Sequence, residues 1–142
     1  MKIEKSKSGY LDKLDLFLKA FLALENGIVE YNTNPDSEVM KAGIIKMYEF
    51  TWELSWKTLK EYLEDENIDF LPSPRQTIKE SFQLDLIDDD ISWINILDDR
   101  NIMNHTYDQM RADELVPKII NEYFEQFKKL KVKLLEIKAK YE

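Results

Sequence analysis

Glycine and proline, the residues that most often interrupt regular structure, occur only three and four times in the 142 residues of this chain. Between them lie long stretches in which apolar residues recur every three or four positions, the spacing of an amphipathic α-helix. The stretch over 10–30 has such a stripe, made by Leu11, Leu14, Phe17, Leu18, Phe21, Leu22 and Ile28. The sequence has no alternating β pattern and no internal repeat. The spacing therefore predicts an all-α fold.

Polar residues indicate where the first helices end and the next begin. The run over 32–37 predicts a loop, and Asp36 or Ser37 can cap a long helix over 38–66. The apolar positions of that helix include Val39, Ile44, Ile45, Tyr48, Trp52, Leu59 and Leu63. Farther along, Ser73 is a predicted N-cap, with Pro74 at the first helical position and Gln76 completing a capping box. That short helix is expected to run to about Leu84.

Two further helices complete the predicted fold. One starts near the carboxylates at 88–90, which suit a positive helix end, and reaches about Asp108. The last is expected from about Asp113 to Lys140, with Pro117 near its first turn. We expect an up-and-down bundle of about five helices, four long and one short, in a single domain over 1–142 with an ordered core over about 10–140. Helices this long often bury surplus apolar surface against a second copy, so we expect a homodimer.

Composition excludes several classes of function. The chain has no cysteine and a single histidine, so thiol chemistry is absent and no ligand set for a structural zinc is available. We expect no metal or other cofactor. The charged N-terminus does not read as a signal peptide and no apolar run reaches bilayer length, so we expect a cytoplasmic protein with no membrane contact. The formal net charge of −8 argues against a general nucleic-acid binder, and no DNA binding is expected.

One segment stands apart from the helical packing pattern. Residues 99–107, Asp-Arg-Asn-Ile-Met-Asn-His-Thr-Tyr, hold the one histidine together with a guanidinium, two carboxamides and a phenol. On a helix, Arg100 shares an apolar face with Ile96, Met103 and Tyr107, where an arginine must be paired or must line a cleft. A neighbouring polar stripe consists of Asp98, Asn101, His105 and Asp108. Such an arginine and histidine could cleave a phosphodiester without a metal.

These residues can also have purely structural roles, and those alternatives remain open. Helical geometry sets Arg100 and His105 about 140° apart, so they meet at one phosphate only through the length of the arginine or across a dimer seam. A lone histidine on a helix is commonly a hydrogen-bonded or solvated residue. Tyr107 can equally be a core phenol. Trp52 and Trp56 fit a core or a dimer seam before they fit a base-stacking platform.

The motif and two other blocks carry a family resemblance. Arg100-Asn101-(three residues)-His105-Thr106-Tyr107 resembles the Arg-(four to six residues)-His motif of HEPN domains. The blocks over 48–63, 73–80 and 93–108 are similar, in this order, to those of the nucleotidyltransferase substrate-binding-like proteins. The likeness extends from about Leu11 to Leu135.

The resemblance implies a dimeric helical protein that forms a complex with a minimal nucleotidyltransferase encoded nearby. Some relatives are RNase toxins, in which the motif acts on RNA from a cleft at the dimer interface. By matching position, these roles would fall on Arg100 and His105, with Asn101 and Asp99 as supporting residues. In that type the nucleotidyltransferase neutralises the toxin, and the position of Tyr107 can be nucleotidylated.

Two functions follow as hypotheses. The first is a metal-independent endoribonuclease that uses Arg100 and His105, the toxin half of a toxin–antitoxin pair. The alternative is a non-catalytic subunit that presents substrate to, or regulates, the nucleotidyltransferase. A plainer third interpretation is a helical dimer in which the motif is a structural relic.

Overall fold

The computed structural model describes residues 7–105 and 108–141, and every regular element within these ranges is helical. Four long helical rods form the body. They are α1 (Lys7–Thr33), α2 (Glu38–Asp65), α4 (Asp90–His105), and a continuous rod of α5 (Gln109–Lys118), the π-helix η1 (Ile119–Tyr123), α6 (Phe124–Lys138) and the 3₁₀ turn η2 (Ala139–Tyr141). The short α3 (Pro74–Gln83) lies between α2 and α4. The all-α prediction, with four long helices and one short one, is confirmed.

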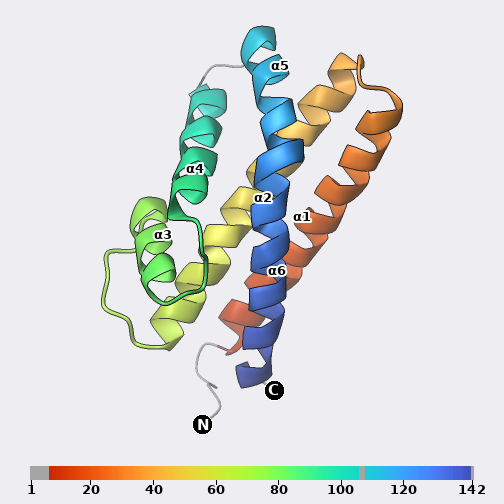
Figure 1. Cartoon of the computed structure of the whole chain (residues 1–142). Helices are drawn as coiled ribbons and strands as arrows, with labels where there is room; N and C mark the ends of the chain where they lie inside the picture. The colour runs from red at the N-terminus through yellow and green to blue at the C-terminus, as the bar shows by residue number, and fades with distance from the viewer. Residues whose placement is uncertain (1–6, 106–107, 142) are drawn as a thin grey trace.

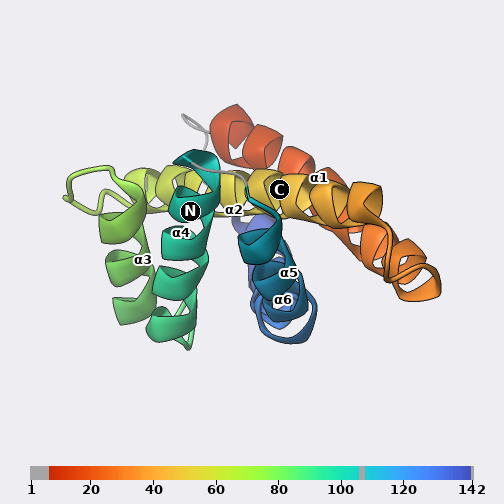
Figure 2. The ribbon, with the colours of Figure 1, turned by 90° about the horizontal axis from the view of Figure 1, so that it is seen from above.

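The long rods alternate in direction along the chain (Figure 1). Helices α1 and α2 lie side by side as a long hairpin, and Figure 2 shows that the turn between them projects beyond the other helices. Helices α3 and α4 and the rod that begins with α5 lie on one side of this hairpin (Figure 2). The C-terminal end of α4 and the N-terminal end of α5 are therefore neighbours at one end of the bundle (Figure 1).

Aromatic residues join α2, α4 and α6 in the core. The ring centroids of Trp52 and Trp93 lie 6.2 Å apart, and Trp93 meets Phe127 edge to face at 5.6 Å. The Tyr48 ring stacks on that of Tyr123 at 5.9 Å. All five side chains are buried. Aromatic pairs in these arrangements each contribute about 0.5–1.5 kcal/mol beyond the area they bury, so α4 is fixed firmly against α2 and the last rod.

Several predicted helix details need correction. The last rod begins at Gln109, four residues before the predicted Asp113, because the Asp108 carboxylate caps α5 by accepting the N–H of Arg111 at 2.8 Å. For the same reason Asp108 does not continue the polar stripe of α4. Pro117 lies near the C-terminal end of α5, not near a first turn, and the π-helical turn η1 follows it. Proline lacks the backbone N–H that a residue in a helix interior donates, so irregular helical geometry beside it is expected.

Two further predictions of local detail are wrong. Ser73 caps α3 as expected, by accepting the N–H of Gln76 at 3.2 Å, but the Gln76 side chain donates to Glu80 and does not reach back to complete a capping box. Leu22 and Val39, assigned to apolar faces, are exposed, Val39 by 82%. Both lie on the α1–α2 hairpin.

Candidate functional site

Helix α4 carries the motif as far as His105, and its first turns are fixed by specific hydrogen bonds. The Asp89 carboxylate accepts from the backbone N–H of Ser92 at 3.0 Å and from its hydroxyl at 2.7 Å. These bonds lower the pKa of Asp89 below its ordinary value. Farther along, the buried Tyr48 hydroxyl of α2 donates to the carbonyl of Ile96. Together, the hydrogen bonds of Asp89 and Tyr48 hold α4 at a fixed rotation about its own axis, and the one to Ile96 lies one turn before Arg100.

Arg100 extends from α4 toward α2. Its Nη2 lies 3.7 Å from Oε2 of Glu53, and its Nη1 donates to Oδ1 of Asn101 at 3.4 Å. The side chain is 28% exposed, and its Nε is shielded from solvent with no hydrogen-bond acceptor among the described residues. A buried donor without a partner costs about 1–3 kcal/mol. The terminal nitrogens make only long contacts and the side chain is partly exposed, so they are the atoms that an anionic ligand could reach.

A cavity of about 340 Å³ lies beside Arg100, bounded by α2, α4 and the start of α3. Its lining residues are Trp52, Glu53, Trp56, Ser73, Pro74, Arg75, Leu97, Arg100 and Asn101. The Arg75 guanidinium pairs with Asp98 at 2.8 Å, which ties the start of α3 to α4 at the rim of the cavity. The prediction that an arginine on this face must be paired or line a cleft is confirmed, since Arg100 does both.

Asp99 lies on a different face of α4 from Arg100. Its carboxylate accepts a hydrogen bond from the hydroxyl of Tyr123 in η1 and lies 3.8 Å from Nζ of Lys118. Burial, together with the Asp99 carboxylate, raises the pKa of Tyr123, so its hydroxyl remains a protonated donor. Asp99 thus joins α4 to the last rod, and any support it gives the site acts through the position of the helix.

The remaining motif residues are described only in part. His105 is the last residue of α4, one turn beyond Asn101, but its side chain lies outside the described structure. Thr106 and Tyr107 also lie outside the described residues. The structure therefore brings together Arg100 and Asn101 at one cavity, and the expected convergence of His105 and Tyr107 on the same cleft stays a prediction.

Sequence reasoning missed two neighbours of Arg100. Glu53, its ionic partner, comes from α2, and Arg75 comes from the start of α3. No spacing within one helix reveals a contact between helices, so neither could be found from the motif alone. Trp56 is half-buried and lines the cavity, and Trp52, which lines it too, is a buried core residue.

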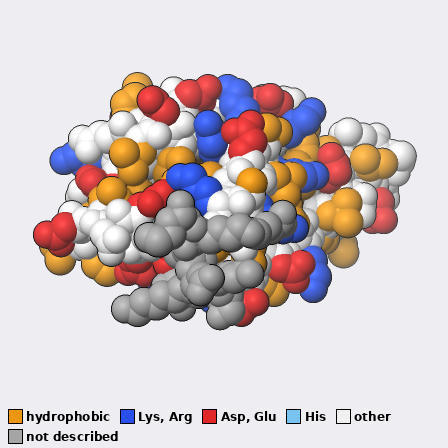
Figure 3. Space-filling model, turned by 90° about the horizontal axis from the view of Figure 1, so that it is seen from below, with side chains coloured by type: hydrophobic (Ala, Val, Ile, Leu, Met, Phe, Trp, Pro, Cys, Tyr) orange, Lys and Arg blue, Asp and Glu red, His pale blue; other side chains and the backbone are white. Residues whose placement is uncertain are grey.

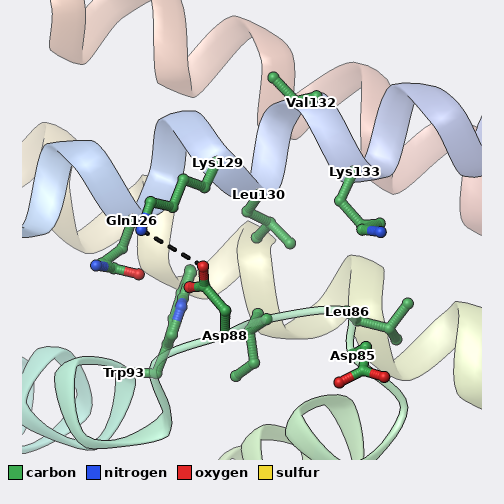
Figure 4. Close-up of a pocket in the computed structure, with 10 residues that line it drawn as sticks. Asp85, Leu86, Asp88, Trp93, Gln126, Lys129, Leu130, Val132 and Lys133 are labelled. Carbon is green, nitrogen blue, oxygen red and sulfur yellow. Dashed lines mark ion pairs between the residues drawn. The ribbon is translucent and has the colours of Figure 1, made fainter.

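A second cavity, of about 450 Å³, lies between α6 and the segment that joins α3 to α4. Figure 4 shows Lys129 of α6 reaching across it to Asp88, with Nζ and Oδ2 3.5 Å apart. Lys133, at the same wall, lies 3.8 Å from Glu136. This second cavity shares no described lining residue with the Arg100 cavity, and no described residue of the motif over 99–107 lines it. We therefore take the Arg100 cavity as the candidate site.

Surface charge, metal ligands and helix hydrophobicity add three observations. Acidic and basic side chains are interspersed over the face in Figure 3, with no continuous basic patch among the described residues seen there. The described part of the chain holds no group of three or more His, Cys, Asp or Glu side chains that could bind a metal ion. Within the same residues, no helix is long and apolar enough to cross a membrane.

Known proteins share both the sequence pattern and the fold. Residues 12–136 match the family described as "Nucleotidyltransferase substrate binding protein like". A Haemophilus influenzae protein named "Probable ribonuclease HepT" is 33% identical, over 71% of this chain and 79% of that protein. A solved Haemophilus influenzae structure, described as the fold of a substrate binding domain of a nucleotidyltransferase, superposes with a TM-score of 0.74 at 26% identity. The superposition covers 86% of this chain and 98% of that one.

These matches agree with the resemblance read from the blocks over 48–63, 73–80 and 93–108, since the family match spans all three. The chain belongs to the nucleotidyltransferase substrate-binding-protein-like family, within the HEPN group that includes HepT.

Proposed function

We propose that this protein is a metal-independent endoribonuclease and the toxin half of a toxin–antitoxin pair. The observation that carries the proposal is Arg100, a half-buried guanidinium at a cavity whose terminal nitrogens make only long contacts, 3.7 Å to Glu53 and 3.4 Å to Asn101. A guanidinium suits the charge that builds on phosphorus during cleavage, since its planar donors match phosphate oxygens. The name of the Haemophilus influenzae relative, a probable ribonuclease, supports the same activity.

The chemistry assigns one task to each residue. His105 takes the proton of the ribose 2′-hydroxyl as its oxygen attacks phosphorus, or protonates the 5′-oxygen that leaves. Arg100 stabilises the pentacovalent phosphorane between these two steps. The 2′-oxygen–phosphorus bond forms and the phosphorus–5′-oxygen bond breaks, which leaves a 2′,3′-cyclic phosphate. Asn101, hydrogen-bonded to Arg100, orients the guanidinium.

A homodimer would supply the second histidine that one chain lacks. The chain has one histidine, so base and acid roles in a single turnover call for two protomers or for one histidine acting in sequence. Arg100 and His105 are about 140° apart on an ideal helix, so facing motifs across a two-fold axis would bring the arginine of one protomer near the histidine of the other.

The partner in this proposal is a minimal nucleotidyltransferase encoded nearby. It would neutralise the toxin by adenylylating Tyr107, which follows His105 by two residues. An adenylyl phosphate at that hydroxyl would bring negative charge beside Arg100 and occupy the place of an RNA phosphate. The adenylyl phosphate would then inactivate the protein by competing with the RNA phosphate for Arg100, with no conformational change needed.

The second candidate is a non-catalytic subunit that presents substrate to the nucleotidyltransferase or regulates it. The net charge of −8 and the interspersed surface charge in Figure 3 favour it, because free RNA binding usually requires a basic surface. The description of the Haemophilus influenzae structure as a substrate binding domain is in line with this role.

Expression in bacteria with and without the neighbouring nucleotidyltransferase gene separates the two candidates. The proposal predicts growth arrest and RNA fragmentation from the wild-type chain alone. It predicts normal growth on co-expression, and normal growth from His105→Ala alone at equal protein levels. A wild-type chain that is harmless and leaves RNA intact would favour the accessory subunit, and arrest that persists in His105→Ala would exclude His105 as the catalytic group.

A further inference from the structure

Gln126 on α6 is a buried amide without a hydrogen-bond partner. Only 8% of the residue is exposed, and its side chain makes no hydrogen bond within the described part of the chain. Its amide oxygen and nitrogen are not sealed, however, in contrast to Nε of Arg100 and Nε1 of Trp56, which solvent does not reach. Most buried side-chain polar atoms have a partner, so an accessible amide that lacks one is a group that a ligand can satisfy.

The amide of Gln126 lines the second cavity, between α6 and the segment that joins α3 to α4. Figure 4 shows it extending from α6 toward Trp93 and Asp88 on the opposite wall. The cavity volume of about 450 Å³ lies within the usual range for small-molecule sites, about 300–1,000 Å³. The space is therefore large enough for a small organic molecule whose polar end meets Gln126.

The walls of this cavity are largely apolar. Four of its lining residues are buried hydrophobic side chains, namely Leu86, Ile87, Trp93 and Leu130. Apolar surface of a ligand gains free energy when it leaves water for such walls, whereas a sugar or an inorganic ion finds no hydrogen bonds there. The walls therefore indicate a ligand with an apolar body.

Lys129 indicates the charge of the polar end. Its Nζ lies 3.5 Å from Oδ2 of Asp88, and the two side chains are 49% and 70% exposed. Exposed ion pairs of this kind contribute little to stability, so Lys129 can turn to another anion at small cost. One carboxylate can accept hydrogen bonds from Lys129 and from the amide N–H of Gln126. A phosphate ester, with a charge of about −1.5 to −2, would be repelled more strongly by Asp85 and Asp88 at the same cavity.

We propose that the second cavity binds a small apolar monocarboxylate. The carboxylate lies between Lys129 and Gln126, and the apolar body packs against the wall that includes Leu86 and Leu130. The site shares no described lining residue with the Arg100 cavity, so its ligand is independent of the proposed cleavage of RNA.

Titration calorimetry of the full-length protein with sodium octanoate tests the site. Its comparisons are 1-octanol and octylammonium, which keep the chain and change the charge of the head. Hydrogen bonds to a charged acceptor are the stronger ones, so octanoate should bind at least about tenfold tighter than 1-octanol. Octylammonium should bind more weakly still, because Lys129 repels it. From butanoate to octanoate, each added CH₂ should strengthen binding by up to about fourfold.

Opposite charge changes at one ion pair assign the binding to this cavity. Lys129→Gln removes the cation, and we expect about tenfold weaker binding of octanoate. Asp88→Asn removes the anion that competes for Lys129, and we expect binding about two- to fivefold tighter. Lys79→Gln makes the same change of charge on α3, outside this cavity, and should leave binding unaltered.

Gln126→Leu tests the amide, since leucine keeps most of the volume and removes the donor and the acceptor. We expect about three- to tenfold weaker binding of octanoate. Far- and near-ultraviolet circular dichroism verify that each variant folds.

The inference would be overturned by the absence of saturable octanoate binding, or by equal affinity for octanoate and 1-octanol. These comparisons need only the wild-type protein, so they decide the matter even if Gln126→Leu fails to fold. Weaker binding of octanoate by Asp88→Asn would also overturn it, because that response belongs to a site for cations. A folded Lys129→Gln with wild-type affinity would place the octanoate elsewhere.

Discussion

Arg100 combines partial burial with incomplete pairing. Its ion pair with Glu53 is long, 3.7 Å, and its hydrogen bond to Asn101 is 3.4 Å. Partly exposed ion pairs of this kind contribute about 0–1 kcal/mol to stability. Stability therefore gives little reason for an arginine at this position, while a partly exposed guanidinium that lines a cavity suits a ligand that carries negative charge.

The substitution Arg100→Lys tests whether the guanidinium itself is needed. Lysine keeps the positive charge and can still pair with Glu53, but it lacks the planar set of donors. We expect the rate of RNA cleavage to fall by at least about 100-fold, as when one transition-state donor is lost elsewhere, while the free energy of unfolding changes by less than about 1 kcal/mol. Cleavage assays and urea unfolding measure the two effects. An unchanged rate would show that charge alone suffices.

We expect Asp99 to contribute to the stability of the fold and not directly to RNA cleavage. The substitution Tyr123→Phe removes the hydroxyl that donates to its carboxylate, and a hydrogen bond to a charged group is worth about 1.5–3 kcal/mol at most. We expect a loss of stability in that range in urea unfolding, with RNA cleavage retained by the folded protein. Tyr31→Phe is the control, since its hydroxyl has no hydrogen bond among the described residues. A stable Tyr123→Phe variant without cleavage would instead give Asp99 a direct role.

Helix starts could be predicted from the sequence where the signal is local. Ser73 and Pro74 lie next to the backbone groups they satisfy, so the start of α3 followed from adjacent residues. The start of the last rod did not, because helical spacing assigns Asp108 to the preceding polar stripe, whereas it is the N-cap of α5. A stripe of helical spacing continues in sequence across a break in the helix, and periodicity alone cannot locate that break.

Pro117 illustrates a second limit at the scale of an element. The sequence shows that a proline must disturb a helix interior, but not how the chain responds. Here α5 continues through Pro117, and the widened π turn over Ile119–Tyr123 follows it. That turn contains Tyr123, the partner of Asp99, so the irregular segment is also one of the places where the last rod contacts α4.

The cap of α4 should make its stability depend on pH. Hydrogen bonds from Ser92 hold the pKa of Asp89 below its ordinary value of 3.8. Because the folded pKa is the lower one, this stabilisation is complete above the unfolded pKa and is lost as pH falls through the folded pKa. We expect the difference in unfolding free energy between wild type and Asp89→Asn to shrink as pH falls below about 3.8, since asparagine caps without titrating. A difference that is constant with pH in urea titrations would contradict this assignment.

The arrangement of the whole molecule explains which parts of the candidate site escaped prediction. Arg100 was identifiable because it interrupts an apolar face between Ile96 and Met103, both of which are buried. Its partner Glu53 lies 47 positions earlier in the sequence, on another helix, and only the packing of α2 against α4 brings the two together. The composition of the cavity is a property of the fold, which no motif encodes.

We propose that residues 1–142 act as one domain and that two copies associate. Exposed apolar side chains near the motif, Ile102 of α4 and Met110 at the start of α5, support association through facing motifs, since exposed apolar surface favours a second copy. We expect one cooperative unfolding transition by both near- and far-ultraviolet circular dichroism, with a midpoint that rises with protein concentration. Separate transitions for the two signals would contradict the single domain. A midpoint independent of concentration, together with a monomer in sedimentation equilibrium, would contradict the dimer.

Cleavage of single-stranded RNA by the purified full-length protein in EDTA tests the central claim most directly. The account predicts that the wild-type protein cleaves and leaves 2′,3′-cyclic phosphate ends. It predicts that His105→Ala, with an unchanged circular dichroism spectrum, is slower by at least about 100-fold, the usual scale of general acid–base catalysis. Cleavage that survives in His105→Ala, or that requires a divalent metal, would contradict the account, as would a folded wild-type protein that leaves the RNA intact.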